Sequence, residues 1–256
     1  MGKPRSLPPR PWIGQCIYCG STVLPLTKEH VLPKALGGKI TLPGASCKLH
    51  QNATRDIEQS VTRDIFGPMR QLHGLRISEP HRHRPIYGNE AELVLPAFAP
   101  ARLLSHWPWP ERLGLFWDTF ESDLRGLPLG PPGPKPRIDR LDFRAFTRVL
   151  AKVALGLAVT RTGIDSFIPW VRPAITDKES DPLTWVGGTP NRYVKLSGQA
   201  THSFVGFDHF VDGRTLLIVQ LQLFAPLGTP VYSVVVGEFT PAGLDKHAGT
   251  NEFFST

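Results

Sequence analysis

Apolar side chains recur at helical spacing in a long segment of the second half of the chain. There they follow one another at steps of three and four residues, the spacing that lines one face of an α-helix: Phe143, Phe146, Leu150, Val153 and Leu157. We expect this helix to run from Asp142 to about Thr162 and to end at Gly163. Lys152 lies in the otherwise apolar face, and we expect its aliphatic stem to carry the ammonium group out to solvent.

A second helical pattern covers residues 53 to about 72, where three apolar residues share one face: Ile57, Val61 and Ile65. Gly67-Pro68 should break this helix, because proline lacks the backbone N–H that a helix interior needs. Three arginines lie on the segment, and a helix laid along a groove of a nucleic acid would bring them to phosphates: Arg55, Arg63 and Arg70. The alternative is an ordinary solvated helix face.

Beyond Pro190 the pattern changes to β-branched and aromatic runs, which are typical of strands. The runs are RYVKLS, THSFVGF, RTLLIVQLQLF and PVYSVVVGEF. Asp212-Gly213 separates two of them in the manner of a tight hairpin turn. We therefore expect a small antiparallel meander after the long helix, which makes the fold class α+β. The densest group of titratable residues in this C-terminal unit consists of His202, Asp208 and His209. We expect these residues to lie at the rim of the sheet and not to form a second active site.

The composition suits a folded protein with long loops. Of 256 residues, 41% are hydrophobic and 20% are charged, so the chain can bury a sizeable core. Pro (26) and Gly (24) together make up nearly a fifth of the chain, against an average of about 12%. Many of them lie in residues 81–140, a predicted connecting region with one short helix near Leu113–Leu124. This region would join an N-terminal domain at residues 12–80 to an α+β unit at residues 141–256.

Three features of the sequence indicate a cytoplasmic setting. No stretch approaches the roughly 18 uninterrupted apolar residues of a membrane-spanning helix, so no membrane contact is expected. The basic, Pro-rich N-terminus has no apolar segment behind it, unlike a secretory signal. The three cysteines cannot form a closed set of disulfides, and we expect them to be reduced thiols.

The net charge of +7 is concentrated at one end of the chain. The first 90 residues carry 13 Lys and Arg against 6 Asp and Glu, whereas the remainder carries 16 of each kind. A local positive excess of this size indicates a polyanionic partner such as a nucleic acid, because neutralised phosphates release their condensed counterions. The alternative is a solvated basic surface that only aids solubility.

All three cysteines lie in this basic segment and form part of two short pairs. Cys16 and Cys19 are separated by two residues and followed by Gly20, so that a tight turn aims both sulfurs at one point. Cys47 and His50 have the same gap, 27 residues further on. Two such pairs suit tetrahedral Zn²⁺ with three Cys and one His ligand, and the metal would supply much of the local folding free energy. The alternative is three unrelated buried cysteines and a surface histidine.

The segment between the pairs reads LTKEHVLPKALGGK. Together with the two pairs, residues 14–78 resemble the HNH endonuclease superfamily in its zinc-ribbon-supported form. The resemblance rests on the first Cys pair, the acid-His-hydrophobe-x-Pro stretch, the Gly-Gly turn and a second pair that opens a helix. It implies a ββα-metal fold for the N-terminal domain.

The resemblance also implies catalytic roles for residues around the first strand. His30 would be the general base that takes a proton from the attacking water, which suits an imidazole at neutral pH. Glu29 would bind a catalytic Mg²⁺ or Mn²⁺ distinct from the zinc, since these ions prefer carboxylate oxygens. Gly37 and Gly38 would form the turn between the strands. Three lysines would hold the substrate backbone: Lys28, Lys34 and Lys39.

Two positions depart from the family pattern. No Asn lies between Val31 and Leu49, where relatives have the Asn that braces the loop of the general base. Gln51 stands where the closing His or Asn is usual. Either Asn52 is the second ligand of the catalytic ion, or His50 serves that ion and leaves the zinc with three protein ligands. We assign His50 to the zinc, because its spacing from Cys47 mirrors the first pair.

The resemblance implies a metal-dependent HNH-type endonuclease that hydrolyses phosphodiester bonds with a His general base, and this is the function that we expect. Double-stranded DNA is the favoured partner. The first alternative is a zinc-stabilised nucleic-acid-binding module with a degenerate, inactive site. A further alternative is a protein-interaction domain in which the zinc ribbon is only architectural. The C-terminal unit carries no motif that can be tied to chemistry.

Overall fold

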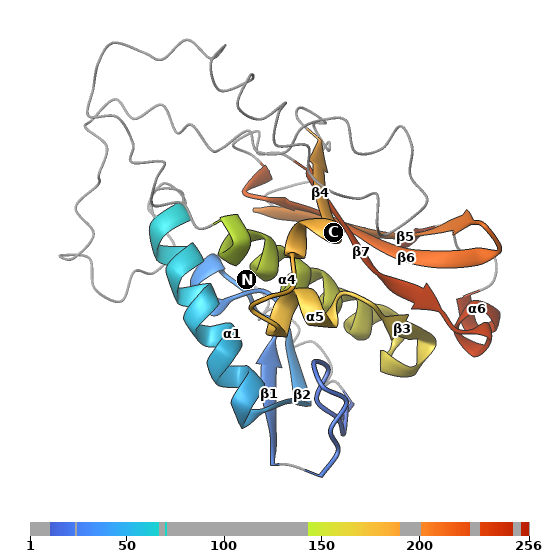
Figure 1. Cartoon of the computed structure of the whole chain (residues 1–256), viewed down its shortest axis with the longest axis horizontal. Coiled ribbons are helices and arrows are strands. Elements are labelled where there is room, and N and C mark those ends of the chain that lie inside the picture. The colour runs from blue at the N-terminus through green and yellow to red at the C-terminus, as the bar shows by residue number, and fades with distance from the viewer. Residues whose placement is uncertain are drawn as a thin grey trace, which may run out of the picture.

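The computed structural model describes residues 11–23, 25–66, 70, 143–189, 201–225, 231–247 and 252–255 (Figure 1). The predicted connecting region at 81–140, its short helix near Leu113–Leu124 and the predicted RYVKLS strand all lie outside these residues. Within them, the structure is a mixture of helices and antiparallel sheet. The predicted α+β class is therefore confirmed.

The N-terminal part consists of a two-stranded sheet and a helix. Strand β1 (Leu26–His30) pairs antiparallel with β2 (Thr41–Cys47), and helix α1 (Lys48–Ser60) follows directly and continues as a π-helical turn (Val61–Ile65). In the register, His30 lies opposite Thr41. The helix begins at Lys48, earlier than the predicted residue 53, because extended Cys47 is its N-cap and the chain turns into the helix straight from the strand.

The C-terminal part is a six-stranded antiparallel sheet with short helices around it. Its neighbouring strands are, in order, β3 (Phe167–Pro169), β7 (Val231–Phe239), β6 (Arg214–Leu223), β5 (His202–Val211) and β8 (Glu252–Ser255), while β4 (Val186–Thr189) also pairs with β7. Two short helices of this part are α5 (Arg172–Thr176) and α6 (Pro241–His247), and 3-10 turns lie at Ile164–Ser166 and Pro182–Thr184. Strands β5 and β6 are joined at Asp212-Gly213, which have φ of 46° and 77°, as a tight hairpin turn requires.

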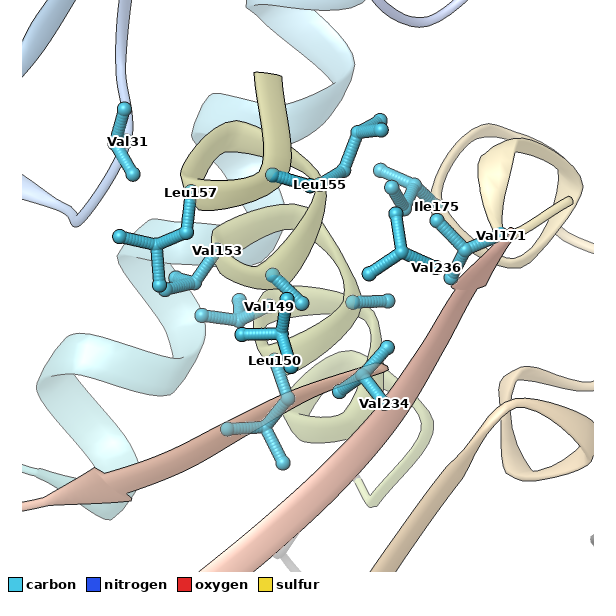
Figure 2. Packing of buried hydrophobic residues seen from close by; sticks show 14 of the residues in the cluster. Val31, Val149, Leu150, Val153, Leu155, Leu157, Val171, Ile175, Val234 and Val236 are labelled. Atoms are coloured by element: carbon cyan, nitrogen blue, oxygen red, sulfur yellow. The ribbon is translucent and has the colours of Figure 1, made fainter. Parts of the chain in front are cut away.

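Helix α4 (Phe143–Thr162) lies between α1 and the large sheet (Figure 1). It ends before Gly163, whose φ of 90° no helical residue adopts, as the sequence predicts. Figure 2 shows Val31 on one side of α4 and Val234 and Val236 of β7 on another. The helix comes close to the N-terminal part at Gly156, where a Cβ would lie 3.1 Å from Cγ1 of Val31.

One continuous hydrophobic core therefore joins the N-terminal and C-terminal parts. The same buried cluster contains Cys16 and Leu36 from the first part, Leu150 from α4, and Val219 from the large sheet. The predicted domain boundaries near residues 80 and 141 remain a prediction. Among the described residues, no helix combines the length and the apolar character needed to cross a bilayer.

Candidate metal centre and the buried ion cluster beside it

The first cysteine pair sits in a tight turn before β1. The N–H of Gly20 donates to the carbonyl of Cys16 at 2.8 Å, and the N–H of Cys16 donates to the carbonyl of Ser21 at 2.9 Å. Gly20 has a φ of 74°, a left-handed conformation that favours glycine. The turn brings Cys16 and Cys19 toward one point, as the Cys-x-x-Cys-Gly spacing predicts.

The second pair completes a four-residue cluster. Cys47 ends β2 and His50 lies in the first turn of α1, with its Nδ1 3.1 Å from Sγ of Cys47 and 3.7 Å from Sγ of Cys16. One ligand atom from each of the four residues lies within 4.8 Å of all the others. Tetrahedral zinc with bonds of about 2.3 Å separates its sulfur ligands by about 3.8 Å. The cluster of Cys16, Cys19, Cys47 and His50 could therefore bind a metal such as zinc.

The surroundings act differently on the ligands of the cluster, because burial raises the pKa of the Cys19 thiol while the pKa values of Cys16 and His50 are lowered. Burial raises the pKa of Cys16, but hydrogen bonds from the backbone N–H groups of neighbouring residues outweigh burial and leave that pKa lowered. Burial also lowers the pKa of His50, so its imidazole is neutral and able to ligate. Arg172 of α5 donates from Nε to the carbonyl of Ile17 at 2.7 Å and places a positive charge beside the thiols.

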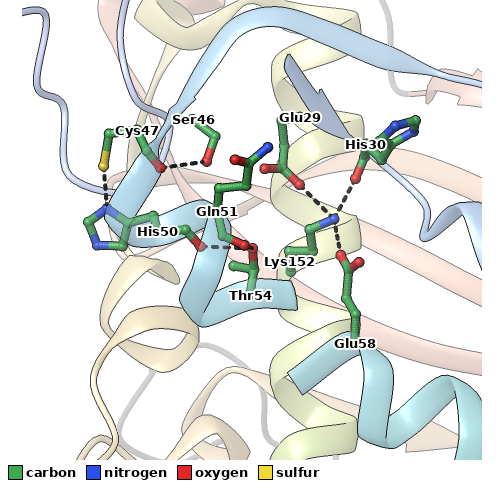
Figure 3. Close-up of polar contacts among 9 residues, drawn as sticks. All are labelled: Glu29, His30, Ser46, Cys47, His50, Gln51, Thr54, Glu58 and Lys152. Carbon is green, nitrogen blue, oxygen red and sulfur yellow. Dashed lines mark hydrogen bonds and ion pairs between the residues drawn. The ribbon is translucent and has the colours of Figure 1, made fainter. Parts of the chain in front are cut away.

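A buried ion cluster lies next to the metal centre, between β1, α1 and α4 (Figure 3). Nζ of Lys152 is 2.8 Å from Oε1 of Glu29 and also pairs with Oε1 of Glu58. The same ammonium donates a hydrogen bond to the backbone carbonyl of His30. The side chains of Lys152 and Glu29 are 2% and 6% exposed, and that of Glu58 is 21% exposed. The contacts thus join three elements of the fold around one cation.

The electrostatics of the cluster keep the lysine charged. Burial lowers the pKa of Lys152, but the two carboxylates outweigh burial and raise it. Burial and the charge of Glu29 raise the pKa of Glu58. Tyr18, which lies between the two cysteines of the first pair, is fully buried, and its pKa is raised well above the usual value by burial and then by Glu29 and Glu58. The metal centre and the ion cluster are therefore within electrostatic reach of each other.

The ion cluster changes two expectations. The prediction that Lys152 reaches solvent is wrong, because its side chain is 2% exposed and its ammonium pairs with Glu29 of β1 and Glu58 of α1. Glu29 does not fit as a ligand of Mg²⁺ or Mn²⁺, since its buried carboxylate already holds an ammonium group. Asn52 is exposed on α1, and the α1 residue that joins Glu29 at the shared cation is Glu58. A role for Asn52 stays a prediction.

His30 is half-buried at the end of β1, and its ring points away from Lys152 (Figure 3). Its pKa is lowered by burial first and then by the positive charges of Lys152, Lys28 and Lys34. Nδ1 is buried, and among the described residues no group hydrogen-bonds to it. Solvent therefore does not reach Nδ1.

The loop after His30 has a conformation that depends on glycine. Gly37 has a φ of 84°, and a Cβ on Gly38 would lie 2.0 Å from the carbonyl oxygen of Leu32.

The loop after His30 is also held by a residue of the large sheet. Nδ1 of His202 accepts a hydrogen bond from the N–H of Phe224 at 3.1 Å, so Nε2 carries the proton and donates to the carbonyl of Leu36 at 2.9 Å. His202, expected at the rim of the sheet, fastens it to this loop.

The basic residues expected to contact a nucleic acid are all exposed: Lys28, Lys34, Lys39, Arg55 and Arg63. The positive charges of Lys28 and Lys34 help to lower the pKa of His30. Arg70, which the helical pattern grouped with Arg55 and Arg63, is buried and donates to the carbonyl of Thr62 at 3.2 Å. Its role is therefore structural.

Sequence reasoning missed Glu58 and the buried position of Lys152. The neighbouring sequence does not reveal the role of either residue, because Glu58 lies among polar residues of a helix and Lys152 is a single lysine among apolar residues. The one available signal was Lys152 itself. A charged residue in the middle of a mostly apolar helix needs a buried partner when the helix is covered on all sides.

No family model matches the chain, and comparisons with curated proteins and with solved structures found no match either.

Proposed function

We propose that the chain is a zinc-stabilised hydrolase of nucleic-acid phosphodiester bonds, related to HNH endonucleases, with His30 as the general base. The observation that carries the proposal is the setting of His30: a half-buried imidazole with a lowered pKa, beside exposed Lys28 and Lys34. The Cys₃His cluster, with zinc as its metal, would supply the rigid base from which β1 presents this residue.

In this proposal His30 accepts a proton at Nε2 from a water molecule. The water oxygen then forms a bond to phosphorus while the bond from phosphorus to the ester oxygen breaks, and the leaving oxygen takes a proton from solvent. A general base in this role contributes roughly 10²- to 10⁴-fold to the rate. Lys28 and Lys34 would hold phosphates of the strand being cleaved. No step is assigned to Glu29, since Lys152 holds its carboxylate.

Replacing His30 with alanine should reduce cleavage by roughly 10²- to 10⁴-fold without unfolding the protein, because no described residue hydrogen-bonds to the buried nitrogen of the ring. The measurement is nicking of supercoiled plasmid by zinc-loaded protein, with added Mg²⁺, with added Mn²⁺ and with neither. His209→Ala, which removes an imidazole from β5, is the matched control and should cleave like the wild type. Equal cleavage by wild type and His30→Ala would show that another group, or a contaminant, does the chemistry.

The pH dependence of cleavage should follow the lowered pKa of His30. A general base works in its neutral form, so the rate should be on its plateau at pH 7 and should fall as the pH drops below the ordinary histidine value of 6.5. Single-turnover cleavage rates measured between pH 5 and about 8 test this pH dependence, because the range extends to both sides of the ordinary histidine pKa. A rate that still rises steeply between pH 7 and 8 would contradict a base with a lowered pKa.

A second candidate function is nucleic-acid binding without cleavage, and the buried ion pair of Glu29 with Lys152 favours it. An acid that is held in this way cannot act on a phosphate through a metal ion. This candidate predicts binding of double-stranded DNA whose affinity falls steeply with salt, with no nicking under any of the three metal conditions. The plasmid assay, combined with a binding assay over a range of salt concentrations, separates the two candidates.

A further inference from the structure

The ion cluster has the composition of a cation-binding site. Three oxygen atoms converge on Nζ of Lys152: one from Glu29 of β1, one from Glu58 of α1, and the backbone carbonyl of His30. They come from two elements that meet at the end of β1, and the cation reaches them from a third, α4 (Figure 3). Carboxylate and carbonyl oxygens are also the ligands that Mg²⁺ and Mn²⁺ prefer.

The ammonium group supplies the positive charge that this set of oxygens needs. It donates to the carbonyl of His30 and forms ion pairs with the carboxylates of Glu29 and Glu58. Two carboxylates facing each other need a positive charge between them, because burial disfavours their ionised forms. Lys152 is 2% exposed, so solvent does not compete with these oxygens for its ammonium. A divalent ion could not enter beside it without strong repulsion between like charges at contact distance.

We propose that the ammonium of Lys152 is the resident cation of this site and replaces the divalent ion that an HNH-type arrangement would place at Glu29. The wild-type chain accordingly binds no Mg²⁺ or Mn²⁺ between Glu29 and Glu58. As a consequence that rests on the proposed function, cleavage by the zinc-loaded protein needs no added divalent ion. The statement about metal binding itself does not depend on any activity.

Manganese titration of the zinc-loaded protein, followed by electron paramagnetic resonance of the free ion, tests the proposal. The wild type should bind no Mn²⁺ at this site. Lys152→Ala removes the ammonium and most of the stem, and should bind one Mn²⁺ per chain. The double variant Lys152→Ala with Glu29→Gln should lose that ion again. Lys48→Ala removes an exposed lysine of α1 and is the matched control, which should behave like the wild type.

Two results would overturn the proposal. One is a wild-type chain that binds one Mn²⁺ which Glu29→Gln abolishes. The other is a folded Lys152→Ala protein that binds no Mn²⁺, because the oxygens would then not form a cation site. A melting curve of each zinc-loaded variant establishes that it is folded before the titration is read.

A measurement on the wild type keeps the proposal testable if Lys152→Ala does not fold. Acetylation of lysines, followed by mass spectrometry, should modify Lys152 at least about tenfold more slowly than exposed Lys28 or Lys34, since a buried, ion-paired amine stays protonated. Adding Mn²⁺ should leave this protection unchanged. Faster acetylation of Lys152 in Mn²⁺ would mean that the metal displaces the ammonium, and would overturn the proposal. None of these experiments contains nucleic acid, so a failure of the proposed cleavage leaves their outcome unaffected.

Discussion

Replacing Cys47 with serine, or removing the bound metal with a chelator, should unfold the N-terminal part of the chain and much of the shared core. Structural zinc sites contribute an apparent binding free energy of about 10–16 kcal/mol, which is as large as the whole stability of an ordinary domain. Cys16 and Cys47 belong to the core cluster that continues through α4 into the large sheet. We therefore expect one cooperative transition rather than local loosening of residues 12–60.

Far-UV circular dichroism and thermal melting measure this loss, and a metallochromic dye should report one zinc released per chain. Tryptophan fluorescence provides a second readout, because Trp170 and Trp185 pack on the large sheet. The matched control is Leu49→Ser, which lies between the two ligands of the second pair and is 72% exposed. It should keep the wild-type melting temperature. A chelated protein with an unchanged spectrum and melting curve would show that the four ligands do not hold the fold together.

Parts of the fold that depend on short stretches of sequence could be predicted closely. The long helix was expected from Asp142 to about Thr162 and is observed at Phe143–Thr162, because apolar spacing and a terminal glycine act within a few residues. The Asp212-Gly213 turn has the same local origin. The four residues of the metal centre were also predicted, since the spacing within each pair dictates which side chains can point at a common centre.

Parts that depend on packing between distant segments could not be predicted in this way. Lys152 bonds to the carbonyl of His30 across 122 residues of sequence, and the pattern around it says only that a lysine stands among apolar residues. Whether such a lysine reaches water or a buried acid depends on what covers the helix. The contact from His202 to Leu36, 166 residues apart, is of the same kind. Both contacts act on the segment that carries and follows His30.

The position of His30 is set from two sides. Cys47 and His50 of the candidate metal centre lie at the end of β2 and in the first turn of α1, and a metal bound there would fix both. Strand β2 is paired with β1 up to His30 itself. Lys152 then ties the carbonyl of His30 to Glu58, in the second half of α1. The imidazole is thus presented by a backbone that is held at both ends, even though its own Nδ1 is not hydrogen-bonded by any described residue.

Replacing Arg148 with methionine should lower the free energy of unfolding by about 3–5 kcal/mol. Arg148 lies on α4 and is 7% exposed. It donates to one backbone carbonyl within α5 and to three that follow it: Ala174 at 2.8 Å, Asp177 at 2.6 Å, Lys178 at 3.1 Å and Ser180 at 2.9 Å. Methionine fills a similar volume but offers no donor, so these oxygens lose a charged partner. Hydrogen bonds to charged groups contribute about 1.5–3 kcal/mol each, and water can replace some of them at the exposed end of the segment.

Urea unfolding of zinc-loaded protein measures the change, which corresponds to a fall in melting temperature of about 10 °C. Arg144→Met is the matched control, because Arg144 lies one turn earlier on the same helix and is exposed; it should change stability by less than about 0.5 kcal/mol. Arg148→Lys should lie between the two, since one ammonium keeps the charge but cannot span four carbonyls as the planar guanidinium does. If Arg148→Met and Arg144→Met have the same free energy of unfolding, the hydrogen bonds from Arg148 to α5 and the segment after it do not stabilise the fold.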